Sequence, residues 1–266
     1  MPPPDNPILI FDSGIGGLSI YRKIMQMLPD ISVVYCADNA GFPYGLQKEA
    51  DVINRTRHYL TMLTKRYRPA LAVVACNTAS TIVLPSVRQA LNIPIVGVVP
   101  AIKTAGKLSR NRCIGLLATL STVNRYYTDQ LIQRFANDCE IIRVGSNELV
   151  YMAEHYVRDR VVDKHVLKEI LSPFFRGNTS PDTIVLGCTH FPLLKHLLRT
   201  TLPSCLNWID SGEAIARRVR SLLHSGAAEK PAMNVCNRFV YTGSSIEIDK
   251  LSPTLKAEGF QEIYLL

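Results

Sequence analysis

Two cysteines stand out among the residues that could do chemistry, because each follows a short apolar run and precedes small polar residues. Cys76 lies in LAVVACNTAS and Cys188 in TIVLGCTH. This context is typical of a turn from a buried strand into a helix, where the helix N-terminus stabilises a thiolate and lowers a thiol pKa. The same turn offers backbone N–H groups to an anion. Both cysteines are therefore candidate acid–base or nucleophilic groups.

Polar neighbours of the two cysteines suit the same chemistry. Thr78 and Thr189 are placed to cap the expected helices and to donate to an anion. His190 follows Cys188 by two residues and is a candidate proton partner for that thiol. The remaining cysteines lack such a context and are expected to be small buried hydrophobic groups: Cys36, Cys113, Cys139, Cys205 and Cys236.

Paired thiols on opposite sides of a carbon atom could invert a stereocentre, because inversion needs a base on one face and an acid on the other. Spacing alone leaves three rivals open: a redox disulfide, a metal site, and a hydrolase built on Cys188 and His190. Redox pairs usually show Cys-x-x-Cys, which is missing here, and Cys-x-His with a distant cysteine is no standard zinc spacing. The hydrolase would leave Cys76 without a role.

A glycine-rich segment, DSGIGGLS, starts at Asp12 after an apolar run. Gly14 and Gly16 match the first two glycines of a dinucleotide fingerprint, and Asp38 lies at the distance of its ribose-binding acid. Ser19 occupies the third glycine position, however, and Asp12 would put negative charge beside a pyrophosphate. The segment favours a tight strand-to-helix turn that carries a functional Asp12 over a nucleotide site.

A second loop carries Pro43, Tyr44 and Gly45. Pro-Tyr-Gly is ordinary turn chemistry. Because the loop follows the second apolar run, we expect it at the same rim as Asp12 and Cys76.

The elements that position these residues are short apolar runs alternating with longer helical segments. The runs cover 8–11, 31–35, 71–75, 95–99, 113–117, 141–144, 183–186 and 206–209. Most are apolar throughout, as in parallel strands buried on both faces, and segments 50–67 and 161–175 are long enough for crossover helices. The pattern predicts an α/β protein with mostly parallel sheets, although eight runs would also suit a barrel.

An internal echo favours two lobes over a barrel. The run before Cys76 resembles the run before Cys188, and FDSG at 11–14 is echoed by IDSG at 209–212. In each case the polar residues follow a strand's carboxyl end, where open α/β sheets bind ligands. We expect a first lobe of residues 1–97, to which 209–266 return, and a second lobe of 98–208, with the active site in the cleft between them.

Composition restricts the class of protein. The chain has 266 residues, 47% hydrophobic and 20% charged, which excludes intrinsic disorder, and no apolar run approaches the ~20 residues of a membrane span. The start, MPPPDN, lacks the basic region of a signal peptide. Seven scattered cysteines indicate a reducing compartment. We therefore expect a cytoplasmic protein.

The net charge of +8 would suit an anionic partner such as a nucleic acid. The basic residues are dispersed, and the two densest groups lack the interleaved aromatic residues of a single-strand binding groove. A solvated basic surface explains the charge more simply, so no specific nucleic acid is expected. A basic nucleic-acid-binding protein is kept as the alternative from a different class.

Taken together, six segments resemble the aspartate/glutamate racemase superfamily, and the glutamate racemases most closely: FDSGIGGLS, DNAGFPYG, VVACNTAST, VVGVVPAI, VLGCTHFPLL and IDSGEAIARR. They are spread from residue 11 to about 218. Aspartate racemases typically have Thr-Glu after the second cysteine, whereas here Thr189 precedes His190. A racemase of another amino acid, such as aspartate, is the nearest alternative.

The resemblance implies interconversion of L- and D-glutamate for peptidoglycan synthesis, by two α/β lobes related by a pseudo-twofold axis. It implies no metal, pyridoxal phosphate or nucleotide cofactor. Cys76 would take the α-proton from D-glutamate with help from Asp12, and Cys188 would take it from L-glutamate with help from His190. The remaining substrate contacts would come from Ser13, Pro43, Tyr44, Gly45, Asn77, Thr78 and Thr189.

The sequence departs from the family at one acidic position near the site. Many glutamate racemases have a glutamate where Tyr151 stands in GSNELVYMAE, with Glu148 and Glu154 three residues to either side. Either neighbour could take the role, or the role could be dispensable, so no acid here is included among the catalytic residues. The resemblance also admits activation by a muramoyl peptidoglycan precursor and a homo-oligomer, neither of which any residue demands.

Overall fold

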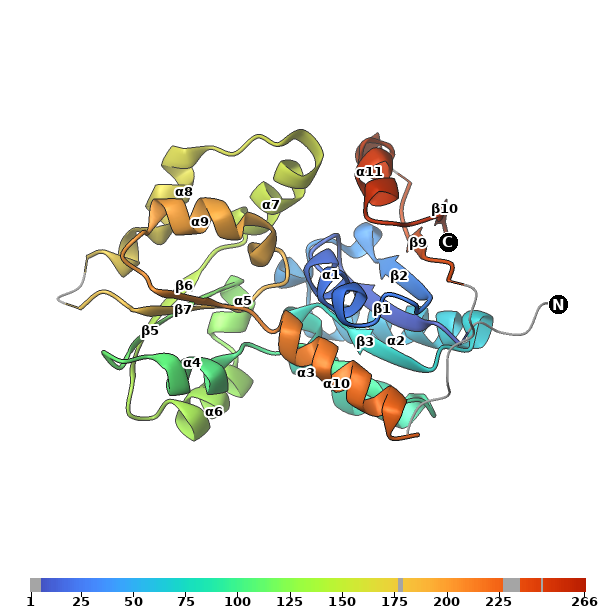
Figure 1. Cartoon of the computed structure of the whole chain (residues 1–266), viewed down its shortest axis with the longest axis horizontal. Coiled ribbons are helices and arrows are strands. Elements are labelled where there is room, and N and C mark those ends of the chain that lie inside the picture. The colour runs from blue at the N-terminus through green and yellow to red at the C-terminus, as the bar shows by residue number, and fades with distance from the viewer. Residues whose placement is uncertain (1–5, 177–178, 227–234, 245) are drawn as a thin grey trace. The chain divides into compact units, whose positions relative to one another are not determined.

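The computed structural model describes residues 6–176, 179–226, 235–244 and 246–266. The chain divides into two compact units: unit 1 comprises Met1–Val98 and Gly212–Leu266, and unit 2 comprises Val99–Ser211. Each unit has its own open sheet, in which all paired strands are parallel (Figure 1). The predicted α/β class with mostly parallel sheets is therefore confirmed, and the eight apolar runs form no barrel.

Unit 1 contains a six-stranded sheet. Its strand order is β10 (Glu262–Leu265), β9 (Arg238–Tyr241), β2 (Val33–Ala37), β1 (Ile8–Asp12), β3 (Leu71–Val74) and β4 (Ile95–Gly97). Strands β1, β2 and β3 are buried along their whole length. Helices cover both faces of these strands, which explains why their sequences are apolar throughout.

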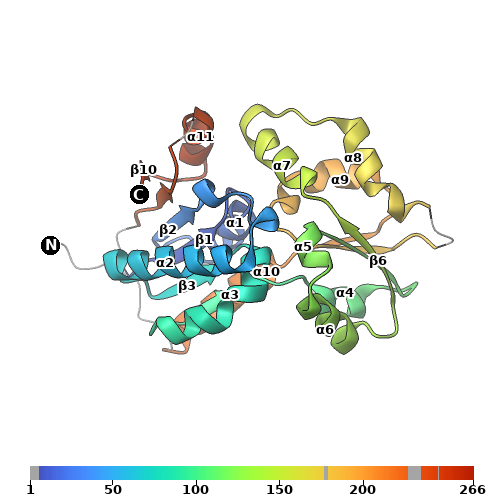
Figure 2. The same cartoon turned by 180° about the vertical axis from the view of Figure 1, so that it is seen from behind.

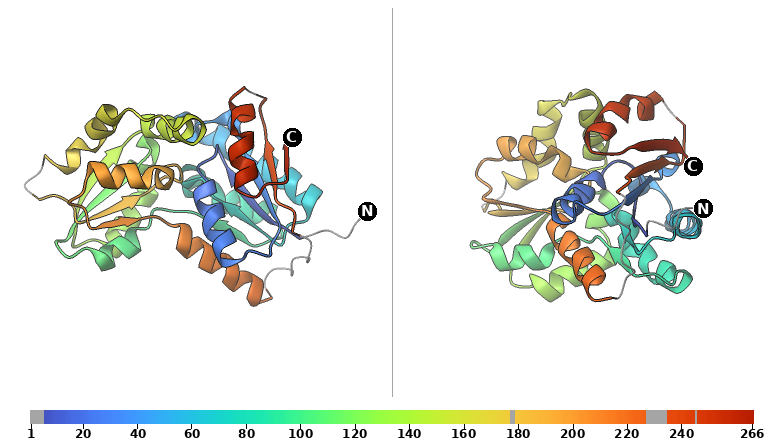
Figure 3. Two further views of the ribbon diagram at one scale, coloured as in Figure 1. Left: turned by 45° about the horizontal axis from the view of Figure 1, so that its top comes forward. Right: turned by 45° about the vertical axis from the view of Figure 1, so that its right-hand side comes forward.

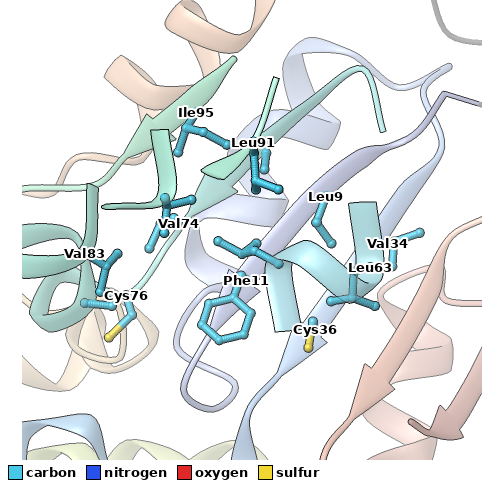
Figure 4. Packing of buried hydrophobic residues seen from close by; sticks show 14 of the residues in the cluster. Leu9, Phe11, Val34, Cys36, Leu63, Val74, Cys76, Val83, Leu91 and Ile95 are labelled. Atoms are coloured by element: carbon cyan, nitrogen blue, oxygen red, sulfur yellow. The ribbon is translucent and has the colours of Figure 1, made fainter. Parts of the chain in front are cut away.

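Two pairs of helices cover the unit 1 sheet. They are α1 (Leu18–Met27) with α10 (Gly212–His224), and α2 (Glu49–Tyr67) with α3 (Asn77–Ala90) (Figures 1 and 2). On α2, Val52, Leu60 and Leu63 recur at helical spacing and belong to one core cluster with Leu9 and Phe11. Figure 4 shows Leu63, Leu9 and Phe11 of this cluster. Helix α11 (Ile246–Ala257) connects β9 to β10.

Unit 2 contains a four-stranded sheet with the order β6 (Glu140–Gly145), β5 (Cys113–Ala118), β7 (Thr183–Leu186) and β8 (Asn207–Ile209). One face carries a core formed with α4 (Ile102–Leu108), α5 (Leu120–Val123) and α6 (Tyr126–Phe135). The other helices are α7 (Glu148–Asp159), α8 (Lys164–Leu171) and α9 (Lys195–Thr201). Figure 3 shows α9 on the opposite side of the strands from α4 and α6.

The two sheets share one strand order. In unit 1 the first four strands lie in the order β2-β1-β3-β4, and in unit 2 the next four lie as β6-β5-β7-β8. Cys76 follows β3 and Cys188 follows β7, so the two cysteines follow equivalent strands. The similar segments FDSG and IDSG do not lie at equivalent strands, because the first is at the end of β1 and the second at the end of β8.

Three elements differ from what the sequence predicts. No apolar run predicts strands β9 and β10, because β9 begins with Arg238 and ends with Tyr241, and β10 is an edge strand with exposed ends. The helix expected over 161–175 begins only at Lys164, because Asp163 caps it, and ends at Leu171 before a 3₁₀ turn. Among the described helices, none is long and apolar enough to cross a membrane.

Candidate active site

Three strand ends meet at the carboxyl edge of the unit 1 sheet. The backbone N–H of Asp38 donates to the carbonyl oxygen of Asp12 at 2.8 Å, and that of Ala75 donates to the carbonyl oxygen of Phe11 at 2.7 Å. The end of β1 therefore lies beside the residues that directly follow β2 and β3, as parallel pairing requires.

Asp12 is fully buried at this edge, and its carboxylate accepts a hydrogen bond from the Gly14 N–H at 2.9 Å. The Tyr35 hydroxyl donates to the Gly14 carbonyl oxygen at 2.8 Å and fixes the other side of the turn. A Cβ at Gly17 would lie 2.7 Å from that hydroxyl and 3.0 Å from the Asp12 Cβ. Gly17 is thus required for close packing, which supports the interpretation of this segment as a tight turn around Asp12.

Cys76 occupies the N-cap position of α3 and is 6% exposed. Its thiol lies 3.8 Å from the Ser13 hydroxyl, which comes from the loop after β1. The predicted position of this thiol at a helix N-terminus is therefore confirmed. The prediction that Thr78 caps this helix is wrong, because the N-cap residue is Cys76 and Thr78 lies buried within the first turn.

Two of the expected substrate contacts in unit 1 have side chains that bind the protein itself. The Asn77 amide donates to the Val98 carbonyl oxygen at 3.2 Å. The Tyr44 hydroxyl donates to the Asp38 carboxylate at 2.5 Å, and burial, followed by the Asp38 charge, raises the pKa of Tyr44. The phenol therefore stays protonated near neutral pH and donates to Asp38.

Cys188 lies two residues after β7 and is 6% exposed. The Gly187 N–H donates to the Leu117 carbonyl oxygen at 2.7 Å and extends the pairing of β7 with β5 up to the cysteine. A 3₁₀ turn over Phe191–Leu194 follows, and α9 begins only at Lys195. The prediction that Cys188 lies at a helix N-terminus capped by Thr189 is therefore wrong.

The partner of the Cys188 thiol is His190, which is buried. Its Nδ1 lies 3.8 Å from the Cys188 sulfur, and its Nε2 lies 2.9 Å from the Glu154 carboxylate. Burial would lower the pKa of His190, but the hydrogen bonds to Cys188 and Glu154 outweigh it and hold that pKa well above its usual range. A protonated imidazole here donates to the thiol sulfur on one side and to the carboxylate on the other.

Glu154 belongs to this cluster although it is absent from the predicted catalytic residues. It is buried on α7, and its second carboxylate oxygen accepts from Arg158 at 3.0 Å. Tyr151 is 40% exposed and Glu148 is also exposed, so Glu154 is the acid of this segment that reaches the histidine. The i,i+4 spacing of Glu154 and Arg158 indicates an ion pair, but no local signal shows that His190 packs against it.

Three of the other cysteines, Cys36, Cys113 and Cys205, are buried as expected. Cys139 and Cys236 are only half-buried, so the prediction that they are buried is wrong. Burial raises the pKa of Cys205 to about 11, raises that of Cys36 well above its usual value, and also raises those of Cys113 and Cys139. These thiols stay protonated and unreactive near neutral pH. Within the described ranges, no three His, Cys, Asp or Glu side chains form a group that could hold a metal ion.

Replacing Glu154 with glutamine should change the titration of His190. The neutral amide no longer favours the imidazolium, so the pKa of His190 falls, and any activity that needs this proton is lost at a lower pH than in the parent protein. We expect kcat to fall about tenfold at neutral pH, about 1.4 kcal/mol of barrier. The pH dependence of kcat and the ¹⁵N resonances of His190 measure both effects.

Glu213→Gln is the matched control, because Glu213 forms an exposed i,i+4 pair with Arg217 on α10. This variant should keep the parent pH profile. A Glu154→Gln protein with an unmoved profile would show that the carboxylate has only a packing role.

Known proteins resemble this chain along most of its length. The Asp/Glu/Hydantoin racemase family matches residues 8–219. The glutamate racemase of Escherichia coli O7:K1 is 46% identical, over 98% of this chain and 91% of the relative. A crystal structure of Escherichia coli glutamate racemase in complex with L-glutamate and the activator UDP-MurNAc-Ala has a TM-score of 0.94 at 45% identity, with 98% of each chain covered.

A more distant structure, glutamate racemase from Francisella tularensis in complex with D-glutamate, has a TM-score of 0.81 at 27% identity, with 98% of each chain covered. The family match spans most of the chain, and the curated relatives match almost all of it. The chain therefore belongs to the Asp/Glu/Hydantoin racemase family, and within that family to the glutamate racemases.

Proposed function

We propose that this chain, a glutamate racemase by family, interconverts L- and D-glutamate with Cys76 and Cys188 as its two acid–base groups and with no bound cofactor. One observation carries the proposal. In two sheets of the same strand order, a buried cysteine follows the equivalent strand, and each thiol has a polar partner 3.8 Å away, Ser13 or His190. This repetition supplies one base for each enantiomer.

The proposed reaction moves one proton at each face of the α-carbon. With D-glutamate, the Cys76 thiolate takes the α-proton, and the electron pair remains on the α-carbon, delocalised into the carboxylate. The Cys188 thiol then delivers its proton to the opposite face and becomes a thiolate, which gives L-glutamate. The reverse reaction exchanges the two roles, so the protein is left ready for the enantiomer it has just made.

Buried polar groups next to each thiol stabilise the charge that develops. His190, held by Glu154, donates towards the Cys188 sulfur and stabilises its thiolate form. We assign the corresponding help for Cys76 to Asp12, which is buried beside the same turn as Ser13. Further substrate contacts are assigned to residues at the same strand ends: Ser13, Pro43, Tyr44, Gly45, Asn77, Thr78 and Thr189.

The product links the enzyme to the cell wall, because D-glutamate is a building block of peptidoglycan. The bound activator of the Escherichia coli structure is UDP-MurNAc-Ala, a muramoyl compound. We propose that a compound of this class activates the present chain as well. All seven cysteines lie in the described part of the chain as thiols, which supports a reducing compartment such as the cytoplasm.

Circular dichroism of L-glutamate incubated with the purified protein in deuterated buffer tests the function. We expect the signal to decay to zero without added cofactor, with deuterium entering at the α-carbon, and to decay faster when UDP-MurNAc-Ala is present. A constant signal with glutamate, both with and without that compound, would remove the proposed function. Racemisation of aspartate without racemisation of glutamate would show that aspartate is the substrate.

A further inference from the structure

The carboxylate of Asp38 is fully buried at the carboxyl end of β2 and accepts four hydrogen bonds. Its Oδ2 accepts from the Tyr44 hydroxyl at 2.5 Å and from Arg55 Nε at 2.7 Å. Its Oδ1 accepts from Arg55 Nη2 at 2.6 Å and from the Thr242 hydroxyl at 2.5 Å. The carboxylate thus joins the end of β2 to the loop at Tyr44, to α2 and to the segment after β9.

Such a site is costly unless it is fully satisfied, since a buried carboxylate without partners loses several kcal/mol of solvation. Here Arg55 forms a two-pronged ion pair with Asp38 and balances its charge. The other two donors, Tyr44 and Thr242, bring uncharged hydroxyls. Both carboxylate oxygens accept two hydrogen bonds each, so each donor is held in a defined place.

Asp38 is also tied to the substrate side of the sheet. Its backbone N–H donates to the carbonyl oxygen of Asp12, the last residue of β1. Tyr44, which its side chain holds, lies between Pro43 and Gly45 in the loop assigned to substrate binding. The side chain and backbone of Asp38 therefore connect two parts of the candidate site, the β1 turn and the Pro-Tyr-Gly loop.

We propose that Asp38, with Arg55, is a positioning residue that holds the backbone of Tyr44 and Gly45 in place for the substrate. This inference rests on the proposed function and adds a residue to it. Asp38 acts through Tyr44 and carries no proton for the reaction. The loop contacts the substrate before and during proton transfer alike, so its displacement weakens binding more than it slows the chemical step.

Asp38→Asn, Tyr44→Phe and the double variant form the test. The asparagine has nearly the same shape but cannot accept from both hydroxyls and both guanidinium nitrogens, and the phenylalanine keeps the ring and loses the hydroxyl that donates to Asp38. We expect Asp38→Asn to raise KM for both enantiomers about tenfold with kcat within about threefold of the parent, because small displacements of binding groups have large effects. The double variant should be no worse than Asp38→Asn, since both act through the same bond.

Asp182→Asn is the matched control. Asp182 is also buried, accepts from the backbone N–H groups of Arg110 and Asn111, and lies before β7, at the opposite end of that strand from Cys188. It should lower the melting temperature without changing KM. Asp38→Asn with the parent KM, or effects of Asp38→Asn and Tyr44→Phe that simply add, would overturn the proposal.

A second variant and the parent protein keep the test conclusive if Asp38→Asn does not fold or the parent is inactive. If Asp38→Asn fails to fold, Tyr44→Phe alone decides, because it leaves the Asp38–Arg55 ion pair intact: a raised KM supports the proposal and a parent KM overturns it. The parent protein measured in parallel separates this inference from the proposed function. A parent that does not racemise glutamate rejects the function itself, whereas an active parent leaves only the role of Asp38 in question.

Discussion

Cys76→Ala and Cys188→Ala should each lower kcat/KM for glutamate racemisation by at least ~10³-fold, a loss of about 4 kcal/mol of transition-state stabilisation. Either variant keeps a base for one face only, so a proton removed from that face cannot be replaced from the other. Serine variants should be similarly inactive, because a hydroxyl keeps the size and polarity of the thiol but is a far weaker acid. Polarimetric or circular dichroism assays in both directions measure the loss.

Two buried cysteines supply the controls, one in each unit: Cys36 on β2 and Cys113 on β5. Their alanine variants remove the same sulfur atom from a buried position within the same two sheets, so they should lower stability and leave kcat/KM per folded molecule unchanged. Full activity in either Cys76→Ala or Cys188→Ala would remove the two-base mechanism.

His190→Ala is expected to have the second-largest effect, about a 10²-fold loss in kcat/KM, at the lower end of what general acid–base groups contribute. The loss must be equal in the two directions, because the enantiomers have equal free energies in water and the equilibrium constant is one. The asymmetry should appear in isotope effects instead. Proton removal by Cys188 becomes rate-limiting, so α-deuterated L-glutamate should show a larger primary isotope effect than α-deuterated D-glutamate.

His196→Ala is the control for this variant. His196 is exposed on α9 and lies 3.1 Å from the Tyr156 hydroxyl, so its loss also removes one histidine hydrogen bond from unit 2. It should leave both the rate and the isotope effects unchanged. A His190→Ala protein that unfolds would instead assign His190 a structural role.

Local sequence patterns were sufficient to predict the fold class. The elements that they missed depend on tertiary contacts. Runs such as 8–11 and 71–75 predict buried parallel strands because helices cover both of their faces. The same reasoning does not predict β10, because this edge strand has exposed residues at both ends and half-buried residues between them, as a surface segment does. The spacing of Cys76 and Cys188 indicated a repeat, and the shared strand order explains it.

In the candidate site, too, the sequence predicts some residues and misses others. Asp12, Ser13, Cys76, Cys188 and His190 follow strand ends, where spacing alone marks them, and the structure brings Ser13 to Cys76 and His190 to Cys188. Residues that act by holding another side chain in place have no such position in the sequence pattern. Glu154 hydrogen-bonds to His190 although it lies 36 residues earlier, and Asp38 accepts hydrogen bonds from residues as distant in sequence as Thr242.

The return of the chain to unit 1 has a consequence for how the protein is made. Strand β2 pairs with β9, with Val34 opposite Arg238, so the two partners leave the ribosome at nearly opposite ends of synthesis (Figure 1). Unit 2 is continuous in sequence and can complete its sheet while β2 still has an open apolar edge, which is prone to aggregation. A chain that stops before β9 would therefore contain both cysteines and still expose an unfinished sheet, so nascent or prematurely terminated chains are the forms of this enzyme that most need a chaperone.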